Sequence, residues 1–208
     1  MLSRLRHIGN MLLVALLVMS CTSCARWREA KGVIAEAERL LVHKIVTRDT
    51  AALNFAINTL DGPLGYVFAK QDLAKAYYFM GRKFYYLNDF STAADYYILC
   101  DRLNPKDPLY KGRINSCMGY LCKQDSCFEE ALEFYLRASC AFKESGSEWY
   151  YAHNLLNVAE CHISLHKYYE ADSLLTIAEA FDIDSTYYAR MIETRGLYFF
   201  ERQEYDSA

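Results

Sequence analysis

Residues 76–100 read AYYFMGRKFYYLNDFSTAADYYILC. Within this stretch Gly81 is followed twelve residues later by Ala93, and Phe90 stands three residues before that alanine. Two antiparallel helices approach closely only where small side chains face each other, so Gly81 and Ala93 predict a helical hairpin. An Asn-Asp pair at positions 88–89 supplies polar turn residues between the two predicted helices.

The twelve-residue interval recurs three times farther along the chain. It joins Gly119 to Ala131, Ala159 to Ala171, and Gly196 to Ala208. An aromatic residue again precedes each alanine by three positions: Phe128, Tyr168 and Tyr205. One hairpin cannot bury its apolar face alone, so neighbouring hairpins are expected to stack. The sequence therefore predicts an all-α solenoid of stacked antiparallel helical hairpins.

Composition and charge agree with this fold class. The 208 residues are 53% hydrophobic and 24% charged, which is typical of a globular chain, and three prolines with nine glycines are too few for a turn-rich all-β protein. The formal net charge of −3 argues against non-specific binding to nucleic acid. No nucleic-acid partner is expected for this segment.

The N-terminus has the features of an export signal. Basic residues Arg4 and Arg6 precede an apolar run over 11–19, which is too short to span a membrane comfortably. The run ends in Val-Met-Ser-Cys at 18–21, which resembles the lipobox of bacterial lipoproteins. The resemblance implies that Cys21 is diacylated and anchors the chain to a membrane of the cell envelope, facing the periplasm or the surface. Lipidation at Cys24, an uncleaved signal anchor and ordinary cleavage stay open as alternatives.

The hairpins resemble the tetratricopeptide repeat, whose pattern combines aromatic residues, Leu-Gly, alanines and a proline. The first repeat matches it at Tyr77, Met80, Gly81, Phe84, Ala93, Tyr97 and Pro105, with Cys100 in place of an alanine. The second is weaker, because Asn115 and Cys122 occupy aromatic positions. The resemblance covers about residues 30–208 and points to tetratricopeptide lipoproteins of the Bacteroidota type.

The expected domain organisation follows from the signal and the repeats. It comprises a lipoprotein signal peptide (1–20), a tether (21–29), a divergent N-terminal helical hairpin (30–63) and tetratricopeptide repeats (64–208). The repeats divide at 64–108, 109–147, 148–185 and an incomplete 186–208. We expect a non-catalytic scaffold or adaptor. The incomplete last repeat keeps open a second interpretation, the periplasmic sensory part of a longer transmembrane regulator, and a glycan-binding lipoprotein is a third.

The first helix of each hairpin carries the expected binding surface, because in this family the first helices line a concave face for peptides or partner helices. Helical spacing from the small residues selects the partner-binding positions Lys75, Tyr78, Arg82, Tyr85, Arg113, Tyr120, Lys123 and Arg190. Their cations favour a protein or peptide partner with acidic groups. An ordinary solvated helix face would have a similar composition, and this alternative stays open.

Cysteine and histidine positions give little support to a metal site. Cys117 and Cys122 stand five residues apart, so on one helix their directions differ by about 140° and they cannot face one ion. No metal or cofactor is expected, whereas a disulfide among the eight cysteines stays open. No catalytic motif is found, so the chain is not expected to be an enzyme. Asp182 and Asp184 are expected to form a loop and a helix cap.

Overall fold

The computed structural model describes residues 23–40, 50–61 and 69–207, with side chains up to Gln203. Within these ranges the regular elements are all α-helices, which confirms the predicted fold class. The chain divides into two compact units, with the boundary between Tyr96 and Tyr97. We describe the N-terminal unit and the C-terminal unit in turn.

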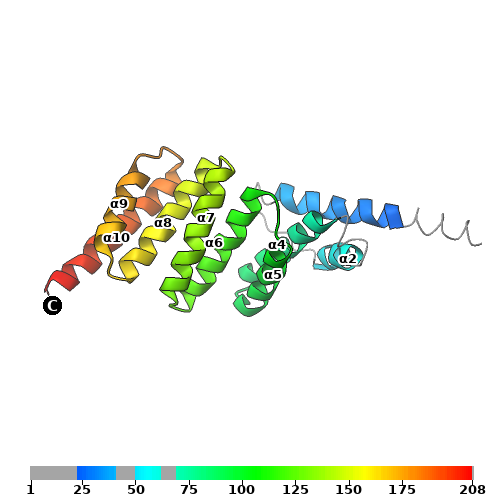
Figure 1. Cartoon of the computed structure of the whole chain (residues 1–208), viewed down its shortest axis with the longest axis horizontal. Helices are drawn as coiled ribbons and strands as arrows, with labels where there is room; N and C mark the ends of the chain where they lie inside the picture. The colour runs from blue at the N-terminus through cyan, green and yellow to red at the C-terminus, as the bar shows by residue number, and fades with distance from the viewer. Residues whose placement is uncertain (1–22, 41–49, 62–68, 208) are drawn as a thin grey trace, which may run out of the picture. The chain divides into compact units, whose positions relative to one another are not determined.

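The N-terminal unit consists of helical residues 23–40, α2 (Thr50–Leu60), α4 (Lys70–Tyr86) and the first half of α5 (Phe90–Arg102). Helix α2 packs on α4 (Figure 1). An ion pair of 3.1 Å between Lys31 and Asp72 joins the first helical segment to α4. Residues 23–29, which the sequence assigned to a tether, belong to that helical segment.

The turn between α4 and α5 lies at the predicted position. Helix α5 begins at Phe90, as the spacing predicted. Asn88 has a φ of 59°, and the N–H of Asp89 donates to the carbonyl of Phe84 at 3.0 Å. A left-handed residue followed by such a bond is the Schellman motif, which satisfies the last carbonyls of a helix. The Phe84 ring stacks on Tyr96 at 5.6 Å, so aromatic packing holds the hairpin together behind its turn.

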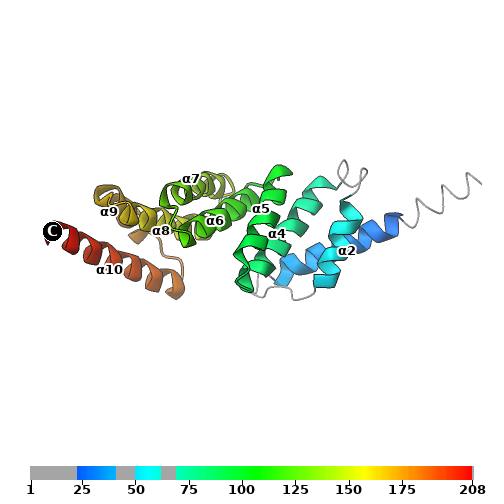
Figure 2. The same cartoon turned by 90° about the horizontal axis from the view of Figure 1, so that it is seen from below.

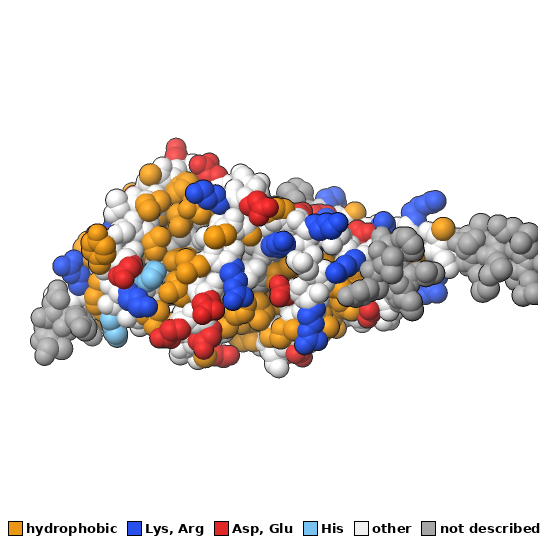
Figure 3. All heavy atoms as spheres, in the orientation of Figure 1, with side chains coloured by type: hydrophobic (Ala, Val, Ile, Leu, Met, Phe, Trp, Pro, Cys, Tyr) orange, Lys and Arg blue, Asp and Glu red, His pale blue; other side chains and the backbone are white. Residues whose placement is uncertain are grey.

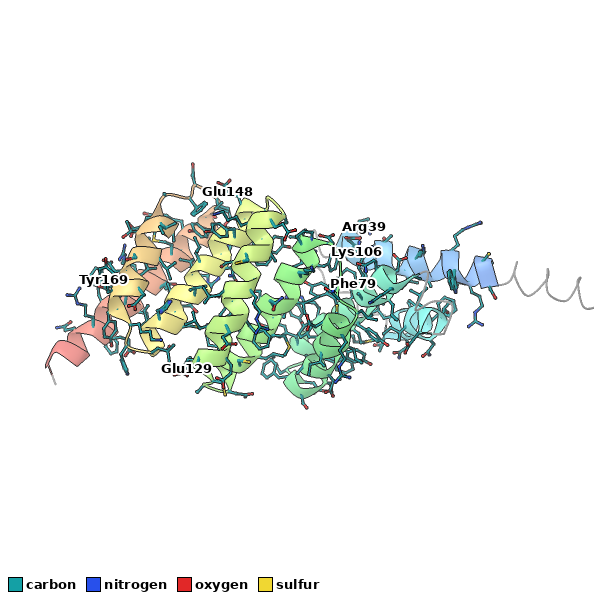
Figure 4. The ribbon with its side chains drawn as sticks, viewed as in Figure 1. Arg39, Phe79, Lys106, Glu129, Glu148 and Tyr169 are labelled. Carbon is teal, nitrogen blue, oxygen red and sulfur yellow. The ribbon has the colours of Figure 1, made fainter. Side chains whose placement is uncertain are left out.

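The C-terminal unit contains two complete hairpins and a further helix. The first hairpin is α6 (Pro108–Gln124) with α7 (Phe128–Glu144), and the second is α8 (Glu148–Ser164) with α9 (Tyr168–Glu179). They are followed by α10 (Ser185–Ser207). Figure 2 shows α7 and α9 above α6, α8 and α10, so first and second helices form separate layers. Figure 4 labels Glu129 and Glu148 near the starts of α7 and α8, at opposite ends of these antiparallel helices.

The small residues lie where the two helices of a hairpin meet. A Cβ atom built on Gly119 would be 2.9 Å from the Tyr135 ring and 3.1 Å from the carbonyl oxygen of Ala131. In the next hairpin Ala159 and Ala171 are both fully buried. The twelve-residue spacing therefore marks close approach of antiparallel helices, and the predicted stacked hairpins are confirmed.

The turns of the C-terminal unit repeat the geometry of the first. Ser126 and His166 have φ values of 59° and 57°. The N–H of Cys127 donates to the carbonyl of Cys122 at 2.9 Å, and that of Lys167 to the carbonyl of His162 at 2.8 Å. The sequence did not reveal this recurrence, in which a left-handed residue stands five positions before Ala93, Ala131 and Ala171. Its residues are Asn, Ser and His, so no single residue type reveals it.

The fourth interval does not form a turn. Helix α10 continues to Ser207, so Tyr205, which the spacing placed at the start of a second helix, lies inside the first one. Gln203 occupies the position equivalent to the left-handed residues, and glutamine favours the helix interior. A Cβ atom on Gly196 would meet nothing within 4 Å. The twelve-residue spacing is present here, but the turn that it predicted is not formed.

Candidate functional site

The first helices of the C-terminal unit are tied together by a set of polar residues centred on one carboxylate. We call Lys123, Asn157, Glu160, Arg190 and Thr194 the Glu160 network. Lys123 of α6 donates to Oε2 of Glu160 at 2.5 Å. Arg190 of α10 donates to Oε1 at 2.9 Å, and the Thr194 hydroxyl reaches the same oxygen at 3.3 Å. Arg190 also donates to the side-chain oxygen of Asn157. One carboxylate in α8 thus joins the helices on either side of it.

The charges of this network outweigh the cost of removing Glu160 from water. The Glu160 side chain is 17% exposed, and the side chains of Lys123 and Arg190 are 23% and 29% exposed. Burial acts to raise the pKa of Glu160, but the positive charges of Arg190 and Lys123 and their hydrogen bonds lower it below its ordinary value. Glu160 therefore stays ionised at neutral pH. Two cations share its single negative charge, which leaves the network with a net positive charge.

Arg113 lies on the same layer of first helices, beside the ring of Tyr150. Its guanidinium donates to the Tyr150 hydroxyl at 2.7 Å and lies 4.7 Å from the ring centroid. The Tyr150 ring also stacks on the ring of Phe142 in α7, with 5.2 Å between the ring centroids. The Arg113 side chain is therefore held between α6 and α8 by an aromatic platform.

These contacts share one separation along the chain. Lys123 and Glu160, Arg113 and Tyr150, and Arg190 and the carbonyl of His153 are each 37 residues apart. Each of these contacts joins the first helices of two neighbouring hairpins. A search for complementary residues 37 positions apart would have found the Lys123–Glu160 pair from the sequence.

Aromatic side chains extend this layer from α8 to α10. The His153 ring lies 4.1 Å from Trp149 and 5.1 Å from Tyr187. The Trp149 indole N–H donates to Asp184 at 2.9 Å, and Asp184 also accepts from the backbone N–H of Tyr187 at 2.8 Å. Asp184 therefore caps the start of α10, as the sequence predicted.

The predicted binding residues of the N-terminal unit have partners within that unit. Lys75 is 3.3 Å from Glu38, again with a separation of 37 residues. Arg82 donates to the hydroxyl of Tyr86 at 2.7 Å and lies 5.7 Å from the ring centroid of Tyr85. Tyr78 is only 2% exposed, so its ring is buried and is not part of an open surface.

The site residues therefore fall into groups that the sequence did not separate. Lys123 and Arg190 meet at Glu160, Tyr120 lies beside Lys123 with 5.8 Å between Nζ and the ring centroid, and Arg113 forms a separate contact with Tyr150. The predicted binding set did not include the residues that hydrogen-bond to Lys75, Arg113, Lys123 and Arg190: Glu38, Tyr150, Asn157, Glu160 and Thr194. Their carboxylate, amide and hydroxyl groups have no distinctive spacing within one repeat.

Large apolar side chains are exposed on several helices. They include Tyr169 of α9 and, on α10, Tyr188, Ile192, Leu197, Phe199 and Phe200. Tyr169 is 84% exposed and is labelled in Figure 4. Figure 3 shows hydrophobic side chains close together over the region where α8 and α9 lie in Figure 1, with acidic and basic side chains around them.

The predicted lipidation site Cys21 lies outside the described residues. In the part of the chain that the structure describes, none of the helices combines the length and apolar character needed to cross a bilayer. Over the same residues, no group of three or more His, Cys, Asp or Glu side chains is placed to hold a metal ion.

No family model matches the chain, and no curated protein matches it. Among solved structures, the chain is similar to the crystal structure of BtubC (BKLC) from P. vanneervenii. The TM-score is 0.59, and the similarity covers 88% of this chain and 85% of that chain. The sequence identity is 14%, so the similarity concerns the fold alone.

Proposed function

We propose that this chain is a non-catalytic protein-interaction scaffold, anchored in the bacterial cell envelope through lipidated Cys21, and that its first-helix layer binds an acidic peptide segment. The observation that carries the binding half is the Glu160 network, in which Lys123 and Arg190 share one carboxylate. A carboxylate of a partner would supply the second negative charge that these two cations lack.

The neighbouring side chains suit the same kind of partner. Arg113 lies against Tyr150, and Tyr120 lies beside Lys123, so two cations of α6 lie beside aromatic rings of α6 and α8. Tyrosine rings give contact area with few rotatable bonds, and the cations select for acidic side chains. The resemblance of the repeats to the tetratricopeptide family, whose first helices bind peptides, supports the same surface.

Binding of synthetic peptides tests the proposal. Three fluorescent peptides of equal length, one rich in Asp and Glu, one uncharged and one rich in Lys, are titrated with the purified chain lacking residues 1–21 while anisotropy is measured. We expect only the acidic peptide to bind, with an affinity that falls as salt is raised. Equal binding of all three peptides, or of none, would contradict the proposal.

Paired variants locate the surface. Arg113→Gln removes a cation from the first-helix layer, and we expect it to weaken acidic-peptide binding about tenfold, the scale of one charge-assisted contact. The control is Arg137→Gln on α7, where the arginine is exposed and pairs with Glu133 one turn away. Equal loss in both variants would show that net charge, and not this surface, governs binding.

The anchoring half of the proposal has its own experiment. Metabolic labelling with a palmitate analogue should mark the wild-type chain and a Cys24→Ala variant, and should fail for Cys21→Ala. Label that persists in Cys21→Ala and disappears in Cys24→Ala would move the lipid to Cys24. This result leaves the binding half of the proposal intact, because the two halves rest on different residues.

A further inference from the structure

Two cysteines stand at the two ends of the turn between α6 and α7. Cys122 lies in the last turn of α6, and Cys127 directly precedes α7. The backbone N–H of Cys127 donates to the carbonyl of Cys122 at 2.9 Å. The two residues thus occupy the two ends of a Schellman motif, whose side chains commonly contact each other.

This backbone bond places the pair within reach of a disulfide. A single N–H···O=C bond of this length keeps the two Cα atoms within about 7 Å of each other, and disulfides join Cα atoms about 4.4 to 6.8 Å apart. Within the described ranges, three other turns contain the same bond: Asp89 to Phe84, Ser147 to Phe142 and Lys167 to His162. Among these four turns, only the one between α6 and α7 has a cysteine at both ends.

The surroundings of the sulfur atoms set the order in which they react. Cys127 is exposed, whereas Cys122 is half-buried and packs against a core cluster that contains Cys161. Burial raises the pKa of Cys161 to about 12, and burial is also the largest cause of the raised pKa of Cys122. Since the thiolate is the reactive form, an oxidant in solution meets Cys127 first, and the fully buried Cys161 stays a thiol.

We propose that Cys122 and Cys127 are a disulfide-forming pair that closes the turn between α6 and α7. The oxidant is a disulfide that reacts with the two thiols by thiol–disulfide exchange. The Cys127 thiolate attacks one sulfur of that disulfide and releases the first thiol, and the Cys122 thiolate then attacks Cys127 Sγ and releases the second. Two protein thiols are oxidised and one disulfide is reduced to two thiols, with two protons transferred to them. The proposed export of the chain would place the pair in a compartment where such exchange is favoured.

Peptide mapping after oxidation tests this pairing. The reduced protein is treated with oxidised glutathione, alkylated and digested with trypsin without reduction. Cleavage after Lys123 separates the peptide 114–123, which contains Cys122, from the peptide 124–137, which contains Cys127. We expect these two peptides to be recovered as one species, two hydrogens lighter than their sum, and to separate again after reduction.

Variants distinguish this pairing from its competitors. Cys117 shares the peptide 114–123 with Cys122, so Cys117→Ser must leave the linked species unchanged while Cys122→Ser must abolish it. Cys161→Ser should also leave it unchanged. A link between 114–123 and 144–167, which contains Cys161, would overturn the proposal. Stable glutathione adducts on Cys127 without any linked peptide would also overturn it, because they would show that Cys122 cannot reach Cys127.

Discussion

The guanidinium of Arg190 in α10 lies 2.9 Å from the carboxylate of Glu160 in α8. The other oxygen of the same carboxylate accepts a hydrogen bond from Lys123 in α6. Three successive first helices are therefore joined by one side chain, in addition to the apolar contacts between hairpins. Charge as well as packing thus fixes how these repeats stack.

Loss of the Glu160 charge should destabilise the C-terminal unit. In Glu160→Gln, Lys123 and Arg190 would lie close together without a counter-charge. We expect the free energy of unfolding, measured by urea denaturation, to be roughly 1–3 kcal/mol lower than in the wild type. Glu193→Gln on α10 removes an equally charged but exposed side chain and should change stability by less than about 0.5 kcal/mol. Equal effects of the two substitutions would show that the network contributes nothing specific.

The same carboxylate predicts a pH dependence. Burial raises the pKa of Glu160, and the stronger opposing effect of Arg190 and Lys123 lowers it below 4.5. A lowered folded-state pKa means that the stabilisation is fully present above the unfolded pKa and is lost as pH falls through the folded pKa. The stability difference between wild type and Glu160→Gln should therefore be constant from about pH 7 to pH 5 and shrink below about pH 4.5. Urea titrations at several pH values measure it, and a difference that grows on acidification would contradict it.

The tight packing at Gly119 should not tolerate a methyl group. A Cβ atom there would lie 2.9 Å from the Tyr135 ring, so Gly119→Ala should lower stability by about 1–3 kcal/mol. Gly196→Ala is the matched control, because a Cβ atom there meets nothing within 4 Å. Since glycine is unfavourable inside a helix, this control should be stabilised by about 0.5–1 kcal/mol. Thermal unfolding of both variants measures the expected loss of stability in Gly119→Ala and the expected gain in Gly196→Ala. A stabilised Gly119→Ala would contradict the close approach of α6 and α7 at Gly119.

The left-handed turn residue offers a stabilising substitution. Ser126 is exposed with a φ of 59°, a conformation that costs residues with a Cβ atom energy and glycine none. We expect Ser126→Gly to be about 0.5–1 kcal/mol more stable than wild type, measured under reducing conditions. Ser126→Ala keeps the Cβ atom and should give no gain. A gain in the alanine variant as large as in the glycine variant would place its origin outside the backbone.

The sequence predicted the hairpins because their requirement is local and repetitive. Close helices need small residues such as Gly119 and Ala131 at a fixed interval, so the spacing is visible without coordinates. The left-handed turn residues were not predicted, because Asn88, Ser126 and His166 differ in type and share only a backbone conformation. At Tyr205 the spacing was present but the turn was not, since Gln203 favours a continuing helix.

By itself, the sequence determined the helical class, the hairpin interval, the starts of α5, α7 and α9, and the cations expected on the first helices. Only the tertiary structure decided what those cations contact. Lys123 and Arg190 are 67 positions apart and meet because each neighbours Glu160 in the stack. Tyr78 is buried although it shares the predicted stripe. Helical periodicity gives the direction of a side chain from its own axis, whereas its burial and partners depend on which helices pack beside it.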